Sequence, residues 1–300
     1  MLFMRILNIG SLNIDYVYAV DHFVRPGETL ASLNFSVFAG GKGFNQSIAL
    51  ARAGAAASHA GKVGKDGAWL VARLEQEGVD ASAIATAEAA TGHAIIQVIP
   101  SGENAIVLHG GANQSVSESD IARALARHKA GDYLLVQNEI SSVADAIRGG
   151  AKRGMKVVFN PAPISPAVRG YPLDLVDLFI LNETEAEGLT EKTAFEDIRA
   201  EMRRRFPKAM TVLTLGGRGA VCFDAGALYR QPAFAVNALD TTAAGDTFTG
   251  YFLAGLMEHG DAARALELGC RAAAICVTRP GAADSIPLRK ELEQGKPRSD

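Results

Sequence analysis

The chain has 300 residues and a formal net charge of −3. With 48% hydrophobic and 21% charged residues, its composition is that of a soluble globular protein with ample chain for a large core. The charge balance argues against a nucleic-acid surface, and no apolar stretch reaches the roughly 18 residues of a membrane helix. Cys222, Cys270 and Cys276 form no C-x-x-C pair. We therefore expect reduced thiols in a cytoplasmic protein, without a structural metal or a disulfide framework.

The N-terminal region predicts two kinds of strand. Residues 1–10 (MLFMRILNIG) indicate a first buried strand. Residues 13–20 (NIDYVYAV) alternate like a half-exposed strand, with Asn13 and Asp15 on one face and, on the other, Ile14, Tyr16, Tyr18 and Val20. Further along, two short apolar runs flank PSGEN, which is a hairpin signal. We therefore predict a small β-sheet, within about 12–38 and 92–110, that covers a site with one face and meets a partner with the other.

Residues 38–54 read FAGGKGFNQSIALARAG, which places glycines and a lysine ahead of a helical pattern. A phosphate loop requires Ser or Thr after its Gly-Lys, but Lys42 is followed by Gly43. A dinucleotide fingerprint requires a third glycine where Gln46 stands. The stretch therefore serves another ligand or none.

The rest of the chain alternates short apolar runs with amphipathic segments, which is typical of βαβ units. We predict one α/β domain over 1–300, an open and mostly parallel sheet sandwiched by helices. The C-terminal third adds helices at about 245–258 and 261–278. The predicted buried strands are 133–137, 156–160, 178–182 and 211–215.

Polar residues follow each of these four runs, where ligands of an open parallel sheet bind. Any one of these turns could simply end a strand. Four together, two of them acidic, favour a polar crevice. The turns are Asn138–Glu139, Asn160–Pro163, Asn182–Glu185 and Gly216–Gly219.

Residues 239–257 (LDTTAAGDTFTGYFLAGLM) carry the strongest local signal. The small residues Ala243, Ala244 and Gly245 lead into a helix, so its first N–H groups can bind an anion. Asp246 follows at the entrance. A carboxylate there can be a helix cap, or it can be the base that takes a proton from an attacking hydroxyl. The spacing leaves both roles open.

With these residues in place, the chain resembles the ribokinase (PfkB) family of sugar kinases over residues 10–287. One family signature matches Gly40–Ser47, and a second matches Asp240–Asp246, almost 200 residues later. The resemblance implies an ATP-dependent kinase for the primary hydroxyl of a sugar, with D-ribose as first candidate. Alternatives are a kinase for a nucleoside or for another sugar (deoxyribose, a fructose-type or a keto-deoxy sugar), and a catalytically silent sugar-binding protein. A dinucleotide-dependent oxidoreductase is disfavoured, because the chain lacks the glycine fingerprint of that class.

The resemblance also assigns sugar contacts. The glycine-rich loop becomes a sugar clamp, in which glycines admit the ring and Asn45 bonds hydroxyls. Asp15 and Asn13 accept from the sugar on one side and Glu139 holds the other. Asp246 is the catalytic base. The remaining contacts come from Gly41, Lys42 and Gly43, where we favour backbone contact by Lys42 over a solvated side chain.

For the nucleotide and ions, the resemblance places Asn182 at the phosphates and Glu185 on magnesium through water, although NETE also fits a capped helix start. Cys270 would contact ATP, although a buried helix thiol is the simpler interpretation. The other expected nucleotide contacts are Thr214, Leu215, Gly216, Gly217, Arg218, Gly219, Ala244 and Gly245. A potassium site would comprise Asp240, Thr242, Cys276, Arg279, Gly281 and Ser285.

Two expectations concern specificity and assembly. Phe44 and Tyr251 depart from the family signatures, so we expect either to reshape the sugar pocket. Tyr16, Tyr18 and Val20 should face outward if Asp15 faces the sugar, and a contiguous apolar patch marks a partner surface. Because members of the family pair through their lid sheets, the resemblance implies a two-fold homodimer.

Overall fold

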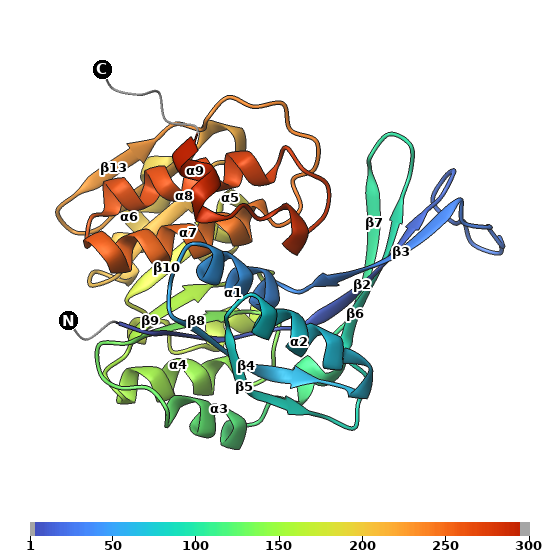
Figure 1. Cartoon of the computed structure of the whole chain (residues 1–300). Helices are drawn as coiled ribbons and strands as arrows, with labels where there is room; N and C mark the ends of the chain where they lie inside the picture. The colour runs from blue at the N-terminus through green and yellow to red at the C-terminus, as the bar shows by residue number, and fades with distance from the viewer. Residues whose placement is uncertain (1–3, 295–300) are drawn as a thin grey trace.

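The computed structural model describes residues 4–294. Its main sheet has nine strands in the order β13-β12-β11-β10-β9-β8-β1-β4-β5 (Figure 1). The strands from β11 to β5 run parallel, whereas β12 and β13 add an antiparallel edge. The predicted open, mostly parallel sheet is therefore confirmed. The strands are β1 (Ile6–Ile9), β4 (Ala57–Val63), β5 (Asp80–Thr86), β8 (Tyr133–Gln137), β9 (Lys156–Asn160), β10 (Leu178–Asn182), β11 (Met210–Thr214), β12 (Ala220–Phe223) and β13 (Leu228–Gln231).

Helices cover both faces of this sheet, which explains why its strands read as continuous apolar runs. In β8, Leu134 and Val136 pack in one core cluster with α3–α6, while Leu135 packs in a second cluster with α7 and α8. The helices are α1 (Lys42–Arg52), α2 (Ala68–Gln76), α3 (Glu118–Leu125), α4 (Val143–Lys152), α5 (Glu183–Thr190), α6 (Phe195–Arg205), α7 (Ala244–His259), α8 (Ala262–Cys276) and α9 (Arg289–Gln294). Short 3₁₀ turns occupy Lys65–Gly67, Gly111–Ser115, Pro166–Gly170, Leu173–Leu175, Gly216–Arg218 and Ala283–Ser285.

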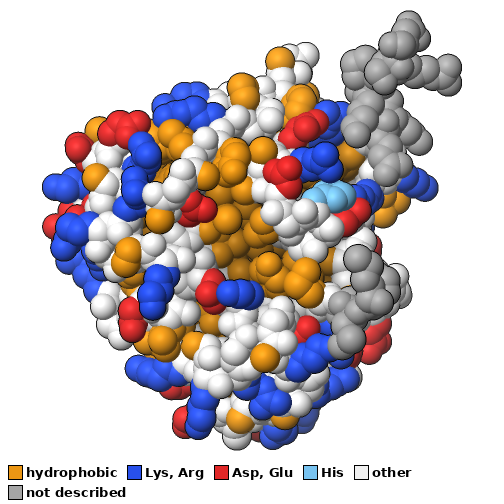
Figure 2. All heavy atoms as spheres, turned by 90° about the vertical axis from the view of Figure 1, so that its left-hand side faces the viewer, with side chains coloured by type: hydrophobic (Ala, Val, Ile, Leu, Met, Phe, Trp, Pro, Cys, Tyr) orange, Lys and Arg blue, Asp and Glu red, His pale blue; other side chains and the backbone are white. Residues whose placement is uncertain are grey.

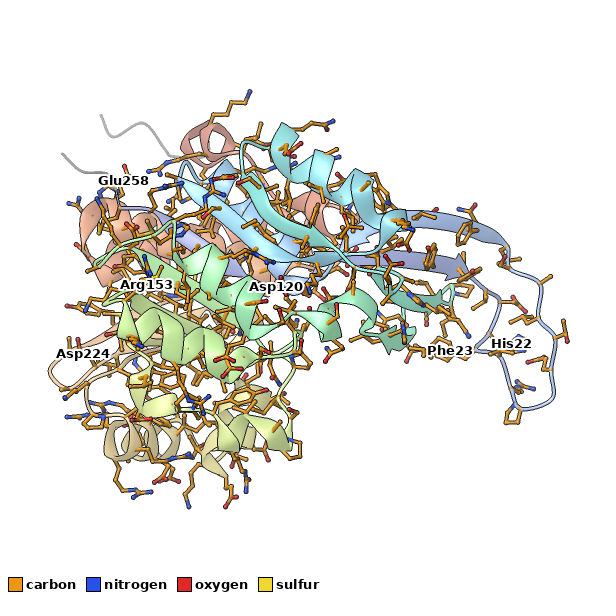
Figure 3. All side chains as sticks on the ribbon, turned by 90° about the horizontal axis from the view of Figure 1, so that it is seen from below. His22, Phe23, Asp120, Arg153, Asp224 and Glu258 are labelled. Atoms are coloured by element: carbon orange, nitrogen blue, oxygen red, sulfur yellow. The ribbon has the colours of Figure 1, made fainter. Side chains whose placement is uncertain are left out.

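The predicted small sheet is present as a four-stranded lid in the order β3-β2-β6-β7. It projects from one side of the body (Figure 1). Seen from below, the loop between β2 and β3, which carries His22 and Phe23, extends beyond the body (Figure 3). The strand β2 pairs with β3 antiparallel and with β6 parallel, and β7 pairs with β6 antiparallel. The lid strands are β2 (Asn13–Ala19), β3 (Asn34–Gly40), β6 (Gly92–Val98) and β7 (Asn104–His109).

The outward face of the lid differs from the prediction. Val20 is 5% exposed, so it is not part of an outward patch. Tyr16 and Tyr18 are half-buried because both rings pack against Phe35, with centroids 6.2 and 4.8 Å away. The strand register instead places four exposed apolar side chains on this face, the lid patch: Phe35 (47% exposed), Val37 (46%), Ile95 (42%) and Val107 (69%).

One face of the body mixes charges of both signs. On the face shown in Figure 2, hydrophobic side chains gather in a central hollow, and Lys, Arg, Asp and Glu side chains alternate around it. Between residues 4 and 294, none of the helices is both long and apolar enough to cross a membrane.

Candidate active site

The site begins where the lid meets α1. The Glu139 carboxylate, beyond β8, accepts hydrogen bonds from Ser11 Oγ (2.5 Å) and from the N–H of Lys42 (3.0 Å). Asp15 lies on the inner face of the lid, and burial together with the Glu139 charge raises the pKa of its carboxyl to about 6. Asn13, next on that face, accepts from Asn113 Nδ2 at 2.7 Å. Asp15 and Glu139 are thus close enough for their charges to interact, and Asn13 lies two residues before Asp15 on the same face of β2.

The glycines of the loop serve mainly to pack the protein against itself. Gly41 has φ of 92°, a conformation that side chains rarely adopt. A Cβ on Gly43 would lie 2.5 Å from the N atom of Ser11, and a Cβ on Gly40 would lie 2.1 Å from Asp15 Oδ2. The sequence predicts that these glycines leave space for a sugar ring. In the structure, the lack of a side chain at Gly43 lets α1 pack closely against Ser11, and at Gly40 it leaves room for the Asp15 carboxylate.

Asp246 lies in the first turn of α7 with 8% of its surface exposed. Its carboxylate accepts from Asn45 Nδ2 (3.0 Å) and Gln46 Nε2 (2.9 Å). Burial raises its pKa, while the nearby Lys42 charge and these two amides oppose that rise. The pKa of Lys42 is in turn raised, first by Asp246 and then by Glu139 and Glu185. The Lys42 ammonium is therefore near enough to three carboxylates for their charges to raise its pKa, while its backbone N–H, which the sequence assigns to the sugar, donates to Glu139.

A chain of buried amides behind Asp246 was not predicted. Gln46 Nε2 also donates to Asn160 Oδ1 (3.1 Å), and Gln46 Oε1 accepts from Gln137 Nε2 (2.7 Å). Gln137 Nε2 donates onward to Asn8 Oδ1 (2.9 Å). These side chains come from β1, α1, β8 and β9, four segments that only the fold brings together. Asn160 was noted as a polar strand end, but nothing in its local sequence indicates Gln46 as its partner.

The start of α7 offers free backbone donors. Ala243 precedes the helix with φ of 59°, which is uncommon for a residue with a Cβ. Within the described chain, the N–H groups of Gly245 and Asp246 donate to no acceptor. A Cβ on Gly245 would also meet open space. The predicted anion hole is therefore open and unpaired beside the Asp246 carboxylate.

A cavity of about 450 Å³ extends from this helix start along α8 to the end of β11. Seven predicted nucleotide contacts line it: Thr214, Gly216, Gly217, Gly219, Ala244, Gly245 and Cys270. The sequence did not indicate the apolar wall formed by Phe234, Val236, Ala238, Ala273, Ala274 and Val277. An apolar cavity that ends at free N–H groups suits a flat ring carrying a phosphate chain.

Comparison with known proteins agrees with this geometry. Residues 4–289 match the model of the pfkB family carbohydrate kinases. The chain belongs to this family. It is 40% identical to a ribokinase of Haemophilus influenzae, over 94% of this chain and 95% of the relative. It is 33% identical to a deoxyribokinase of Salmonella typhi, over 97% and 98%. The structure of an Arabidopsis thaliana ribokinase complexed with ribose and ATP covers 98% of each chain, with 27% identity and a TM-score of 0.88. The protein is thus a ribokinase-family sugar kinase, a phosphotransferase that acts on a sugar hydroxyl.

Three predicted nucleotide contacts of this pfkB kinase have other neighbours. The Leu215 side chain packs against the core, and Arg218 is exposed and paired with Glu183. Asn182 caps α5: its Oδ1 accepts from the Glu185 N–H (2.8 Å), and Glu185 Oε2 accepts from the Asn182 N–H (2.9 Å). The capping role left open by the sequence is therefore present. For Leu215 and Arg218, the side chain does not line the cavity.

The predicted ion-binding residues of this family member lie close together. Asp240 accepts from the N–H groups of Thr242 and Gly281, both at 2.9 Å. Cys276 Sγ lies 3.0 Å from Ser285 Oγ and 3.7 Å from the Thr242 carbonyl oxygen. The loop that carries Asp240 and Thr242 leads directly into the start of α7.

The two residues that depart from the family signatures are both core residues. Phe44 and Tyr251 are 0% exposed and pack in one hydrophobic cluster. The Tyr251 hydroxyl donates to the carbonyl of Pro287 at 2.6 Å. The expectation that either side chain reshapes the sugar pocket by contact is therefore wrong, because neither reaches open space.

Proposed function

We propose that this kinase transfers the γ-phosphoryl group of ATP to the primary hydroxyl of D-ribose, giving ribose 5-phosphate. The observation that carries the proposal is the Asp246 carboxylate, buried and next to two unpaired N–H groups at the start of α7. Its relatives named ribokinase, and the ribose and ATP named for the Arabidopsis structure, make ribose the first candidate. Residues 4–294 would act as one catalytic unit with its lid.

The sugar would lie between the lid and α1. Asp15 and Asn13 would accept from its hydroxyls on one side, and Glu139 and the backbone of Gly41–Gly43 would hold the other. The buried Asn45 Oδ1 has no hydrogen-bond partner in the described chain. A buried acceptor left unpaired is costly, so a ligand hydroxyl is the partner that this amide would receive.

Asp246 would take the proton of the attacking hydroxyl. Because burial raises the pKa of this carboxylate, it is a stronger base than an exposed aspartate. The Gly245 and Asp246 N–H groups would then bind the charge that develops on the transferred phosphoryl oxygens. Lys42, whose pKa is raised by the charges of Asp246, Glu139 and Glu185, would balance the charge of the site.

Magnesium would be held chiefly by the nucleotide phosphates and water. Over residues 4–294, no three His, Cys, Asp or Glu side chains surround a common metal position. Magnesium sites of nucleotide enzymes fit that pattern, since one or two carboxylates and the phosphates suffice. Glu185, 7% exposed and near the Lys42 charge, is the carboxylate that we propose. When bound, the metal would neutralise phosphate charge.

Potassium would bind the loop before α7, where oxygens of Asp240, Thr242 and Ser285 gather, together with the carbonyls of Cys276, Arg279 and Gly281. Oxygen ligands of this kind suit a hard monovalent cation. An ion there would order Ala243 and the free N–H groups. We expect turnover to rise when potassium replaces sodium at constant ionic strength, and equal rates would contradict the site.

The sugar itself is tested by ADP release over pentoses, deoxysugars, hexoses and nucleosides. We expect ribose to give the highest kcat/KM. The deoxyribokinase relative makes 2-deoxyribose the main competitor, and a deoxysugar or nucleoside preferred over ribose would overturn the choice of substrate. Sugar binding without any ADP release would favour a silent binding protein. The buried thiols Cys222, Cys270 and Cys276 fit the cytoplasmic location that we propose.

A further inference from the structure

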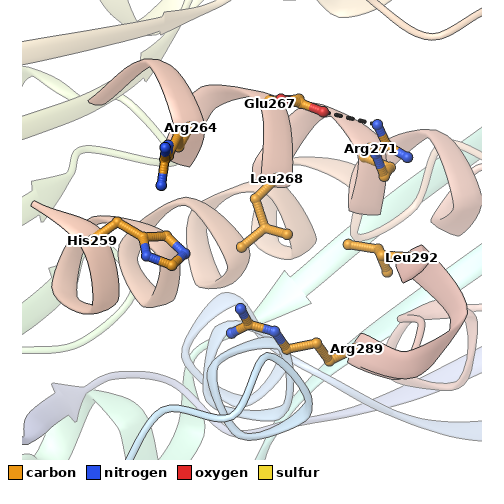
Figure 4. Close-up of a pocket in the computed structure, with 7 residues that line it drawn as sticks. All are labelled: His259, Arg264, Glu267, Leu268, Arg271, Arg289 and Leu292. Atoms are coloured by element: carbon orange, nitrogen blue, oxygen red, sulfur yellow. Dashed lines mark hydrogen bonds and ion pairs between the residues drawn. The ribbon is translucent and has the colours of Figure 1, made fainter. Parts of the chain in front are cut away.

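A second cavity lies far along α7 and α8 from the catalytic end. It has a volume of about 380 Å³ and is bounded by the end of α7, one face of α8 and α9 (Figure 4). We call it the arginine cavity. Its lining residues are His259, Arg264, Glu267, Leu268, Arg271, Arg289 and Leu292.

Arginine side chains surround an apolar centre in the arginine cavity, and each of them lies within 4 Å of a carboxylate. Three arginines line it against one carboxylate, that of Glu267. Arg264 and Arg289 lie on opposite sides of Leu268 in Figure 4. Leu292, which is buried, lines the cavity beneath these side chains. Such a cavity suits a small organic anion whose carbon skeleton rests on the leucines.

Neighbouring carboxylates hold two of the arginines in place. Glu258 lies 2.6 Å from Arg289, and Glu267 lies 2.8 Å from Arg271. Each guanidinium has five N–H donors, so Arg271, and also Arg289 with its further bond to the Ala53 carbonyl, keep donors for a ligand. Arg264 is freer still, because Asp261 is 3.6 Å away, beyond hydrogen-bond distance. Within residues 4–294 its guanidinium donates no hydrogen bond, and its side chain is 70% exposed.

We propose that the arginine cavity binds a small organic anion with at least two negative charges, carried by carboxylates or by a phosphate. Guanidinium groups bind both in a two-pronged geometry, so the chemistry is shared. The opposing interpretation is three ordinary surface ion pairs with no ligand, which are individually weak.

The cavity is connected to the nucleotide site through one residue. The Arg271 guanidinium lies 5.0 Å from the ring centroid of Phe234, which lines the nucleotide cavity. An anion that draws Arg271 away from this ring removes a cation–π contact from the nucleotide wall. We therefore expect it to weaken nucleotide binding about two- to fivefold, the size of such a contact. This coupling rests on the proposed nucleotide site, whereas binding of the anion does not.

Calorimetric titration of the full chain tests the binding. Tricarballylate and glycerol 2-phosphate serve as the carboxylate and phosphate probes, with ADP present to fill the nucleotide cavity. We expect one equivalent of at least one probe to bind with a dissociation constant below about 1 mM. The probe that binds shows whether the site takes a carboxylate or a phosphate. Neither probe binding at about 10 mM would overturn the proposal.

Variants locate the site. Arg264→Gln should weaken binding about tenfold or more, because it removes charged hydrogen bonds. Arg289→Gln should do the same, although it also loses a bond to the Ala53 carbonyl (2.8 Å), so melting temperatures must be compared. Arg204→Gln, an equally exposed arginine paired with Glu201 on α6, is the matched control. Equal binding by the wild type and Arg264→Gln would overturn the site.

The coupling has its own readout. A fluorescent ADP analogue is titrated with and without the bound probe, so no phosphoryl transfer is needed. Weaker binding by about two- to fivefold supports the link through Phe234, and the loss of that effect in Arg271→Gln locates it. An unchanged affinity for the ADP analogue would overturn the coupling. Binding of the anion itself is decided by the titration described above. An inactive kinase that still binds the probe would contradict only the proposed function.

Discussion

Asp246 is buried, yet it is held by two amides and faces a lysine. Those contacts fix the direction of both carboxylate oxygens before any sugar binds. Asp246→Asn keeps the size of the side chain and removes its basicity. We expect kcat to fall roughly 10²- to 10⁴-fold, the usual contribution of a positioned base, with sugar affinity nearly unchanged.

Steady-state kinetics and sugar calorimetry separate the two effects in Asp246→Asn. Asp174→Asn, which alters an exposed carboxylate in the 3₁₀ turn Leu173–Leu175, is the control and should keep normal turnover. A kcat close to that of the wild type in Asp246→Asn would remove Asp246 from the role of base.

Asp15 makes sugar binding depend on pH. The pKa of its carboxyl is raised to about 6, above the ordinary value, so this acceptor is lost as pH falls through about 6. We expect the dissociation constant for the sugar to be about tenfold higher at pH 5 than at pH 8, so that binding is weaker at the lower pH. Calorimetry at both pH values measures this. Asp15→Asn should bind weakly at both, whereas Asp21→Asn, in the exposed lid loop, should behave like the wild type.

The raised pKa of Asp15 also has a consequence for the stability of the folded protein. Because the folded protein binds this proton more tightly than the unfolded chain, stability falls as pH rises from about 4 to about 6 and stays lower above. Asp15→Asn should therefore raise the melting temperature at pH 8 while it weakens sugar binding. A lower melting temperature would show that Asp15 stabilises the free protein.

At the scale of elements, α1 and α7 lie side by side from their first turns onward, and Gln46 joins them. Its side chain donates to Asp246 on α7 and to Asn160 at the end of β9, so one amide sets the position of the carboxylate relative to the sheet. Gln46→Met fills a similar volume without these donors.

We expect kcat of Gln46→Met to fall about tenfold or more, with the sugar KM little changed. Since the Gln46 hydrogen bond lowers the Asp246 pKa, its removal raises that pKa, and the acidic limb of the kcat profile moves to higher pH. The pH profile therefore separates positioning from simple loss of stability. An unshifted limb would contradict the positioning role, and Gln76→Met on exposed α2 is the control.

Most elements could be predicted because their signals are local. The runs at 133–137, 156–160 and 178–182 match β8, β9 and β10, since strands covered on both faces are apolar throughout. The alternation over 13–20 gave the lid strand β2. It placed Val20 outward, however, and the structure buries it, because β2 ends at Ala19 and the alternation of the strand no longer sets the direction of the next side chain.

At the scale of the whole molecule, the site depends on pairings between distant segments. Asn45 and Asp246 are about two hundred residues apart, and two signatures indicated both of them, yet the amides of Asn8 and Gln137 carry no signature at all. They meet because β1 lies between β8 and β4. The apolar wall of the nucleotide cavity, including Phe234, escaped prediction for a similar reason. Part of this wall comes from the loop after β13 and part from the end of α8, two segments that only the fold brings together.

Association into a homodimer is the last property of the whole molecule that the sequence analysis predicts. We propose a homodimer through the lid patch, where four apolar side chains are 42–69% exposed on one face of the lid. Exposed strands with such side chains pair readily with another copy. We expect sedimentation at micromolar concentration to show a species of twice the chain mass of 31.5 kDa.

Val107→Asp tests the surface, because this side chain is 69% exposed and its replacement leaves the core intact. A charge buried without a partner at the interface would cost several kcal/mol, enough to separate the subunits. Leu228→Asp, on the exposed edge strand β13 of the main sheet, is the control and should leave the dimer whole. A wild type that sediments only at the chain mass would end the dimer proposal. A Val107→Asp dimer would mean that the subunits associate through another face.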